Sequence, residues 1–212
     1  MKELPTQERA LKKRTALINA AIYEFAIAGF EVATAKSIAA KAGVATGTFY
    51  QYFENKNDML RVIAHNRFVT LHERVQILEL QEVTFQNDEK AESSTLLSNP
   101  DLHKQFYSTL EFLYEFHAAD PDLHKVLEQR RDLDPKLKAI LDQGEGVLFK
   151  RVLKFVQSFN IPYPELVAEN LFAMAEGLVH RLAFQQISNS KEALNIGAQM
   201  LASYFVSYPN HT

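Results

Sequence analysis

Residues 45–51, Ala-Thr-Gly-Thr-Phe-Tyr-Gln, place small, hydroxyl-bearing and amide side chains around a single phenylalanine. If this segment is helical, Phe49 lies four positions before Phe53, and the two rings share one buried face. The outward face then carries two hydroxyls, a glycine, a phenol and an amide, where a solvated helix normally carries Lys and Glu. Such groups are compact, donate and accept hydrogen bonds, and suit the major groove of DNA. The residues predicted to face outward are Thr46, Gly47, Thr48, Tyr50 and Gln51.

A second short helix is predicted just before this segment. Ile38 and Ala42 give it a small apolar face, and Thr34 or a neighbour caps its start. Gly43 ends it, because a residue without a Cβ can adopt the left-handed conformation of a sharp turn. Residues 55–58, Asn-Lys-Asn-Asp, then read as the cap of a third helix. The pattern predicts two helices joined by a tight turn and followed at once by another helix.

These elements resemble the DNA-binding domain of the TetR family of one-component transcriptional regulators. The family pattern is a threonine, Ile-Ala, Ala-Gly-Val, a small residue, Gly-Thr, aromatic residues around Phe, and a Lys that opens the fourth helix. It is carried here by Thr34, Ile38, Ala39, Ala42, Gly43, Val44, Ala45, Gly47, Thr48, Phe49, Tyr50, Tyr52, Phe53 and Lys56. The family's first helix is matched by Arg14, Leu17, Ile18, Ala20, Ala21, Phe25, Gly29 and Phe30. At the level of motifs the resemblance covers about the first quarter of the chain.

The resemblance implies that the helix after the turn enters a DNA groove. Ala45 stands where the family often has a capping serine, and Ser37 where an acidic residue is common, so both helices are expected to begin weakly. Lys36 is predicted to contact a phosphate, because free backbone N–H groups in the first turn of its helix already favour an anion. The predicted DNA-binding residues are Lys36, Ala45, Thr46, Gly47, Thr48, Tyr50, Gln51 and Lys56.

Charge is distributed unevenly along the 212 residues. Residues 1–60 hold eight Lys or Arg and six Asp or Glu, and residues 61–212 hold fifteen and twenty, so a weakly basic head precedes an acidic body. The basic run at residues 12–14 is either a solvated face or a second phosphate contact. The chain has no cysteine, no apolar run at its start and no segment of roughly 20 apolar residues. We therefore expect a soluble, cytoplasmic protein that contacts no membrane.

The remaining sequence has helical periodicity and no βαβ pattern or internal repeat. One long helix is expected from about residue 56 to residue 80, followed by a polar loop to residue 100 and by further helices. These helices are expected at 101–117, 121–130, 135–159, 164–187 and 191–208, several with a proline at their start. The fold class is therefore all-α. Residues 1–55 are predicted to form a three-helix helix-turn-helix domain, joined by the long helix to a helical domain within 56–212.

The resemblance implies that this second domain holds a small ligand and forms a homodimer through the last two helices. Small residues such as Gly177 and apolar ones such as Met200 fit such an interface, although they could also serve one protomer's core. The ligand site is predicted at Phe106, Tyr107, Leu110, Phe149 and Phe172, which could equally be core residues. His103, His117 and His124 lack the spacing of a compact metal site, so no metal and no cofactor are expected.

The sequence predicts a ligand-responsive homodimer that binds double-stranded DNA at a palindromic operator, most simply a repressor released by an apolar or amphipathic molecule. Two alternatives are a DNA-binding dimer without an effector and a helical ligand-binding adaptor that no longer reads DNA. An enzyme is not expected, because the chain has no Gly-rich phosphate loop, no Gly-x-Ser-x-Gly and no His-Glu-x-x-His.

Overall fold

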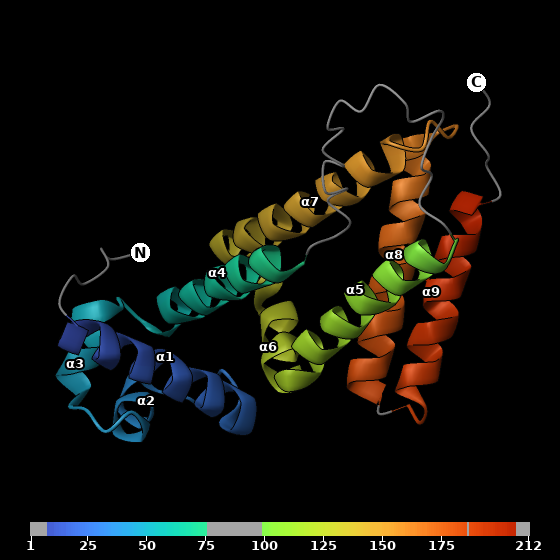
Figure 1. The fold of residues 1–212 in the computed structure, drawn as a ribbon. Helices are drawn as coiled ribbons and strands as arrows, with labels where there is room; N and C mark the ends of the chain where they lie inside the picture. Colours follow the sequence, from blue (N-terminus) through green and yellow to red (C-terminus); the bar gives the residue numbers. More distant parts are fainter. Residues whose placement is uncertain (1–7, 76–98, 186, 207–212) are drawn as a thin grey trace. The chain divides into compact units, whose positions relative to one another are not determined.

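The computed structural model describes residues 8–75, 99–185 and 187–206, and within these ranges it contains helices and no strand. The prediction of an all-α fold is therefore confirmed (Figure 1). The helices are α1 Glu8–Ala28, α2 Ala35–Lys41, α3 Thr46–Tyr52, α4 Lys56–Arg74, α5 Asn99–Ala119, α6 Pro121–Arg131, α7 Pro135–Gln157, α8 Pro164–Gln185 and α9 Ser190–Val206. The part of the long helix predicted beyond residue 75 lies outside the described residues.

The chain divides into two compact units that are not contiguous in sequence. Unit 1 comprises Met1–Thr70 and Asp120–Glu145, and unit 2 comprises Leu71–Ala119 and Gly146–Thr212. The predicted boundary at residue 55 does not coincide with this division. Most of α4 belongs to unit 1, and so does α6, which lies about 50 residues further along the chain. The functional division into residues 1–55 and 56–212 stays a prediction.

Unit 1 has an apolar core to which α1, α2, α3, α4, α6 and the first part of α7 contribute. The predicted buried face of α3 is confirmed, since Phe49 and Phe53 are both 0% exposed and their ring centroids lie 5.7 Å apart. α2 packs against both α1 and α3. Gly43 has φ +69 in the turn between α2 and α3, a conformation that side chains with a Cβ rarely adopt.

A buried ion pair attaches the start of α7 to α4 within unit 1. Arg61 donates from Nε to Asp134 Oδ2 at 2.9 Å and from one terminal nitrogen to Oδ1 at 3.0 Å. Asp134 also caps α7, because its Oδ1 accepts from the backbone N–H groups of Lys136 and Leu137. Burial by itself would raise the pKa of Asp134, but these hydrogen bonds outweigh it and hold that pKa below the ordinary value.

Unit 2 is built around α5, which packs against both α8 and α9 (Figure 1). Phe106 of α5 lies 5.7 Å from the ring of Phe155 and 5.8 Å from the ring of Phe205, so residues of α5, α7 and α9 meet in one aromatic cluster. The end of α4 is held by α7, where Arg151 donates to the backbone oxygens of His72 at 2.8 Å and Val75 at 3.0 Å.

None of the helices in the described ranges combines the length and the apolar composition that crossing a lipid bilayer requires.

Replacing Arg61 with methionine should destabilise unit 1, because it leaves the Asp134 carboxylate buried without its counter-ion. The arginine side chain is 22% exposed, so we expect a loss of about 2–3 kcal/mol, below the 3–5 kcal/mol typical of fully buried pairs. Because the folded-state pKa of Asp134 is depressed, its stabilisation is present above the unfolded pKa near 3.9 and is lost as the pH falls below that value. Urea unfolding at several pH values measures both effects.

The matched control is Lys138→Met, which removes a 2.6 Å pair with Asp142 whose side chains are 49% and 45% exposed. It should change the free energy of unfolding by less than about 0.5 kcal/mol. Equal losses for the two variants would show that the Arg61 pair adds nothing beyond an ordinary surface contact.

Candidate nucleic-acid interface

The start of α2 is closed by a reciprocal pair of hydrogen bonds. The backbone N–H of Ser37 donates to Thr34 Oγ1 at 3.0 Å, and the backbone N–H of Thr34 donates to Ser37 Oγ at 3.1 Å. Together they form a complete capping box. The expectation of a weak start for α2 was wrong, because the hydroxyl of Ser37 accepts the hydrogen bond that an acidic side chain would otherwise accept.

The start of α3 lacks such a cap. Ala45 occupies the N-cap position with extended backbone angles and has no side-chain hydrogen bond to the helix. The first turn is closed through the backbone alone, where the N–H of Thr48 donates to the oxygen of Ala45 at 2.9 Å. No side-chain oxygen of the N-cap residue therefore caps this helix start, and Ala45 and Thr46 are both exposed. Backbone N–H groups at an uncapped helix start can donate to an anion such as a phosphate.

Most residues predicted to face outward on α3 do so. Tyr50 is 52% exposed, Gly47 and Gln51 are also exposed, and Thr48 is half-buried beside Phe49. The ring of Tyr50 packs edge-on against Phe49 with centroids 5.2 Å apart, which limits the directions its hydroxyl can take. No acidic residue occurs from residue 35 to residue 53, so this polar surface carries no charge that would repel phosphates.

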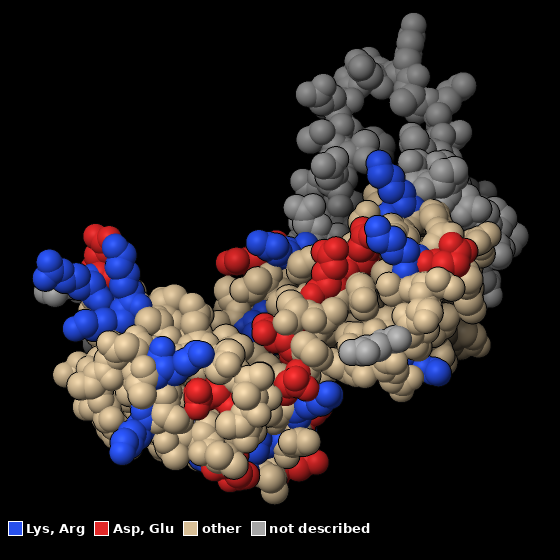
Figure 2. Space-filling view, turned by 90° about the horizontal axis from the view of Figure 1, so that it is seen from below, with Lys and Arg blue, Asp and Glu red and all other residues tan. Residues whose placement is uncertain are grey.

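Cations lie on the neighbouring helices of unit 1. Lys36 is exposed in the first turn of α2. Figure 2 shows Lys and Arg side chains projecting from unit 1 at the end that carries the start of α1. Lys12 in this run pairs with Glu8 at 2.7 Å, and Arg14 lies 5.5 Å from the ring centroid of Phe53. Arg14 therefore packs partly against the unit 1 core, and a phosphate contact by this basic run stays a prediction.

Lys56 has a more specific environment than the sequence indicated. Its side chain is 27% exposed, and its ammonium group donates to the backbone oxygens of Phe30 at 2.7 Å and Glu31 at 3.0 Å. The same group lies 4.6 Å from the ring centroid of Phe30. These contacts hold the loop after α1 against the start of α4. The DNA contact predicted for Lys56 stays a prediction, and its ammonium group is already engaged.

The contacts of Arg130, at the end of α6, were not predicted from the sequence. Its guanidinium group lies 4.6 Å from the ring centroid of Phe30 and donates to Glu31 at 2.8 Å and to Asn57 at 3.5 Å. The ring of Phe30 therefore contacts two cations, one from α4 and one from α6. No signal in the local sequence pairs residue 130 with residues 30 and 57, because the contact joins segments about 70 to 100 positions apart.

The five predicted ligand-binding residues all lie in unit 2, and their role in binding a ligand stays a prediction. Phe106 packs in the aromatic cluster with Phe155 and Phe205, whereas Phe149 packs edge-on against Phe172 at 6.0 Å. The remaining two predicted residues are Tyr107, whose hydroxyl donates to Glu111 at 3.1 Å, and Leu110, which is 1% exposed.

Leu110 forms part of a different feature, an apolar hollow of about 370 Å³ on the surface of α8 and α9. Three of its lining side chains are well exposed, Met174 at 44%, Ile196 at 50% and Met200 at 58%. Of these three, only Met200 was among the residues that the sequence favours for an interface. The full lining is Leu110, Met174, Ala175, Leu178, Ala193, Ile196, Gly197, Met200 and Leu201.

Comparison with known proteins gives consistent results for the amino-terminal helices and for the whole fold. Residues 17–63, from α1 into α4, match the family model described as bacterial regulatory proteins, tetR family. The chain is 24% identical over 176 residues to the uncharacterized HTH-type transcriptional regulator YdgC of Bacillus subtilis (strain 168), covering 83% of this chain and 82% of the relative.

Solved structures extend the likeness to nearly the full chain. A protein of Mesorhizobium loti MAFF303099 assigned to the TetR family superposes with a TM-score of 0.73 at 17% identity, covering 95% of this chain and 98% of the other. SmeT, the repressor of the Stenotrophomonas maltophilia multidrug efflux pump SmeDEF, gives 0.61 at 19% identity over 90% and 89%. At these identities the structures show a shared fold. Together with the family model over residues 17–63, they identify the amino-terminal helices as a helix-turn-helix domain of the tetR family of bacterial regulatory proteins, in a chain that shares the fold of TetR-family transcriptional regulators.

Proposed function

We propose that the protein is a cytoplasmic homodimeric repressor that binds a palindromic operator and releases it when a small apolar or amphipathic molecule binds in unit 2. The observation that carries the DNA-binding part is the outward face of α3, where exposed Thr46, Gly47, Tyr50 and Gln51 form an uncharged polar surface. Such side chains can approach base edges in a major groove without desolvating a charge.

The residues of the interface have different roles in this proposal. Gln51 reads base edges, because its amide can donate and accept at once. Lys36 and Tyr50 contact phosphates, and so does the uncapped start of α3 at Ala45 and Thr46. Thr48 is half-buried on the same helix, and the exposed part of its side chain adds to the surface that contacts DNA. Lys56 fixes the start of α4, the helix that follows α3. It therefore affects DNA binding mainly by setting the position of α3.

The hollow on α8 and α9 supports a homodimer in which a second copy covers this surface. Met174, Ile196 and Met200 leave apolar side chains in water around it, at a cost that burial against another apolar surface would remove. A Cβ built at Gly177 of α8 meets nothing within 4 Å in the protomer, so this position is open to close approach by another helix. The fold relative SmeT is a repressor, which supports the repressor role proposed here.

The effector part rests on the aromatic residues of unit 2, where Phe149 and Phe172 are half-buried and touch only edge-on. A ligand inserted between such rings would gain apolar contact area. The effector-free alternative has an observation in its favour, because Phe106 packs against Phe155 and Phe205 in an aromatic cluster that serves the core of unit 2. The adaptor alternative requires a helix-turn-helix that does not bind DNA, and the exposed polar face of α3 argues against it.

The DNA interface is tested with operators selected from a random duplex library. Gln51→Ala should relax preference at particular base positions by about 1–3 kcal/mol, because it removes base readout. Lys36→Ala should weaken selected and random duplexes alike and lower the slope of log affinity against log salt by about 1, because it removes a phosphate contact. Binding isotherms at several salt concentrations measure both.

Lys150→Ala, at an exposed lysine of α7 in unit 2, is the matched control and should leave the salt slope unchanged. Lys56→Met should differ from Lys36→Ala by lowering the melting temperature as well, since it leaves backbone carbonyls without their donor. If Gln51→Ala and Lys36→Ala affect selected and random duplexes identically, the division between base and phosphate contacts is wrong.

The dimer interface is tested by Ile196→Asp, which places a charge in the apolar hollow. Burying that carboxylate without a partner is unfavourable, so the variant should sediment as a monomer at concentrations where the parent protein is dimeric. It should also lose more affinity for a palindrome than for a half-site. Ile27→Asp, at an isoleucine of α1 that is 70% exposed, is the matched control and should remain dimeric. A dimer that survives Ile196→Asp at low concentration places the interface elsewhere.

The effector site is tested by Phe149→Ala against a panel of apolar and amphipathic compounds. Operator affinity without effector should stay within about twofold of the parent value, whereas release should need about tenfold more effector, equivalent to 1.4 kcal/mol. Tyr163→Ala, at a tyrosine of unit 2 that is 75% exposed, should respond like the parent. If no compound changes operator affinity in the parent protein, the effector-free alternative is correct.

A further inference from the structure

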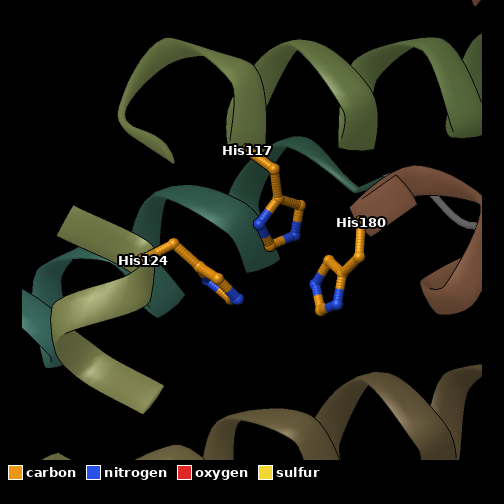
Figure 3. A group of neighbouring side chains, drawn as sticks. All are labelled: His117, His124 and His180. Carbon is orange, nitrogen blue, oxygen red and sulfur yellow. The ribbon is translucent and has the colours of Figure 1, made fainter. Parts of the chain in front are cut away.

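Two histidines of different helices meet inside unit 2. His117 lies near the end of α5 and His180 near the end of α8, and their ring centroids are 4.8 Å apart with the ring planes at 80° (Figure 3). Both side chains are half-buried. Figure 3 also draws His124, which belongs to unit 1. The expectation that no metal is bound rested on the spacing of His103, His117 and His124 along the chain. His180 follows His117 by 63 positions and comes beside it only in the folded structure.

We propose that His117 and His180 bind a divalent transition-metal ion that links α5 to α8. A ring nitrogen of one lies within 4.8 Å of a ring nitrogen of the other. Two imidazoles on one tetrahedral Zn²⁺, each about 2.0–2.1 Å from the ion, place their nitrogens about 3.4 Å apart. The observed separation can therefore close to a chelating one through side-chain rotation, without moving either helix as a whole.

The surroundings hold the two rings in place. Phe184 lies one turn after His180 on α8, with ring centroids 5.4 Å apart, and it also approaches His117 edge-on at 6.3 Å. The ring centroid of Phe116 lies 5.6 Å from that of His117, with the ring planes at 88°. These aromatic contacts limit the orientations of the two half-buried imidazole rings, and the apolar neighbours reduce the access of solvent to the pair.

The donor set determines the class of ion. Neutral imidazole suits Zn²⁺, Cu²⁺ and Ni²⁺, whereas Mg²⁺ and Ca²⁺ prefer oxygen ligands. Two protein ligands leave coordination positions for water or a further donor. The ion would cross-link two helices of the unit 2 core and so stabilise their packing, since a ligand that binds the folded state raises its stability.

The probes are Zn²⁺ and Co²⁺ added to tag-free, full-length protein in the absence of DNA. We expect one ion per protomer by equilibrium dialysis, visible d–d absorption with Co²⁺, and a rise in melting temperature of about 3 °C or more at saturating Zn²⁺. His180→Phe keeps a ring against Phe184 but removes the ligand nitrogen, so it should abolish all three effects while leaving the metal-free melting temperature within a few degrees. His180→Cys should restore Co²⁺ absorption, because a thiolate is also a ligand.

His65→Phe, at an exposed histidine of α4, is the matched control and should bind one ion like the parent protein. A His180→Phe variant that binds Zn²⁺ as the parent does would overturn the proposal, and so would a parent protein whose melting temperature ignores Zn²⁺. Either result would mean that His117 and His180 make only a ring contact within unit 2. Because no measurement here involves DNA or an effector, the outcome is independent of the proposed repressor function.

Discussion

The position of α3, the helix that we propose enters a DNA groove, depends on one cluster in unit 1, in which the ring of Phe30 is contacted by the ammonium group of Lys56 and the guanidinium group of Arg130. α3 has only seven residues, and a helix of that length has no stability of its own in water. Its orientation therefore comes from its buried phenylalanines and from the helix that follows it. The Phe30 cluster fixes the start of that helix, α4, against the loop after α1.

The same cluster explains why α6 belongs with the DNA-binding helices rather than with the helices next to it in sequence. Arg130 contacts Glu31 and Asn57, and the pair between Arg61 and Asp134 attaches the start of α7 in the same way. Each of these two attachments depends on an arginine, because a planar guanidinium group can stack on a ring and bind a carboxylate at the same time. Unit 1 is thus assembled from two separated segments, and charged contacts secure the second segment to an apolar core.

The sequence predicted the elements well because their signals are local. The cap at Asn55, the prolines at the starts of α6, α7 and α8, and the left-handed Gly43 each act within a few residues. Contacts between distant segments were not predictable in this way, since nothing in the local pattern pairs Arg130 with Phe30 or His117 with His180. The predicted ligand-binding residues also depend on contacts between segments that are distant in sequence. Helical periodicity identifies an apolar face, but it does not tell whether Phe106 lines a cavity or packs against Phe155.

The two units are covalently joined at three places, Thr70–Leu71 within α4, Ala119–Asp120 between α5 and α6, and Glu145–Gly146 within α7. Two of these junctions lie inside continuous helices, and the third precedes Pro121, which restricts the backbone of Asp120. A change in unit 2 can therefore reach α3 as a displacement of α4 or α7, whose starts are held in unit 1 by the Phe30 cluster and by Asp134. Because a DNA duplex accepts two recognition helices only at a fixed separation, a small displacement of unit 1 would oppose binding in the proposed dimer. The strength of that effect is limited by how much better an effector binds one arrangement than the other.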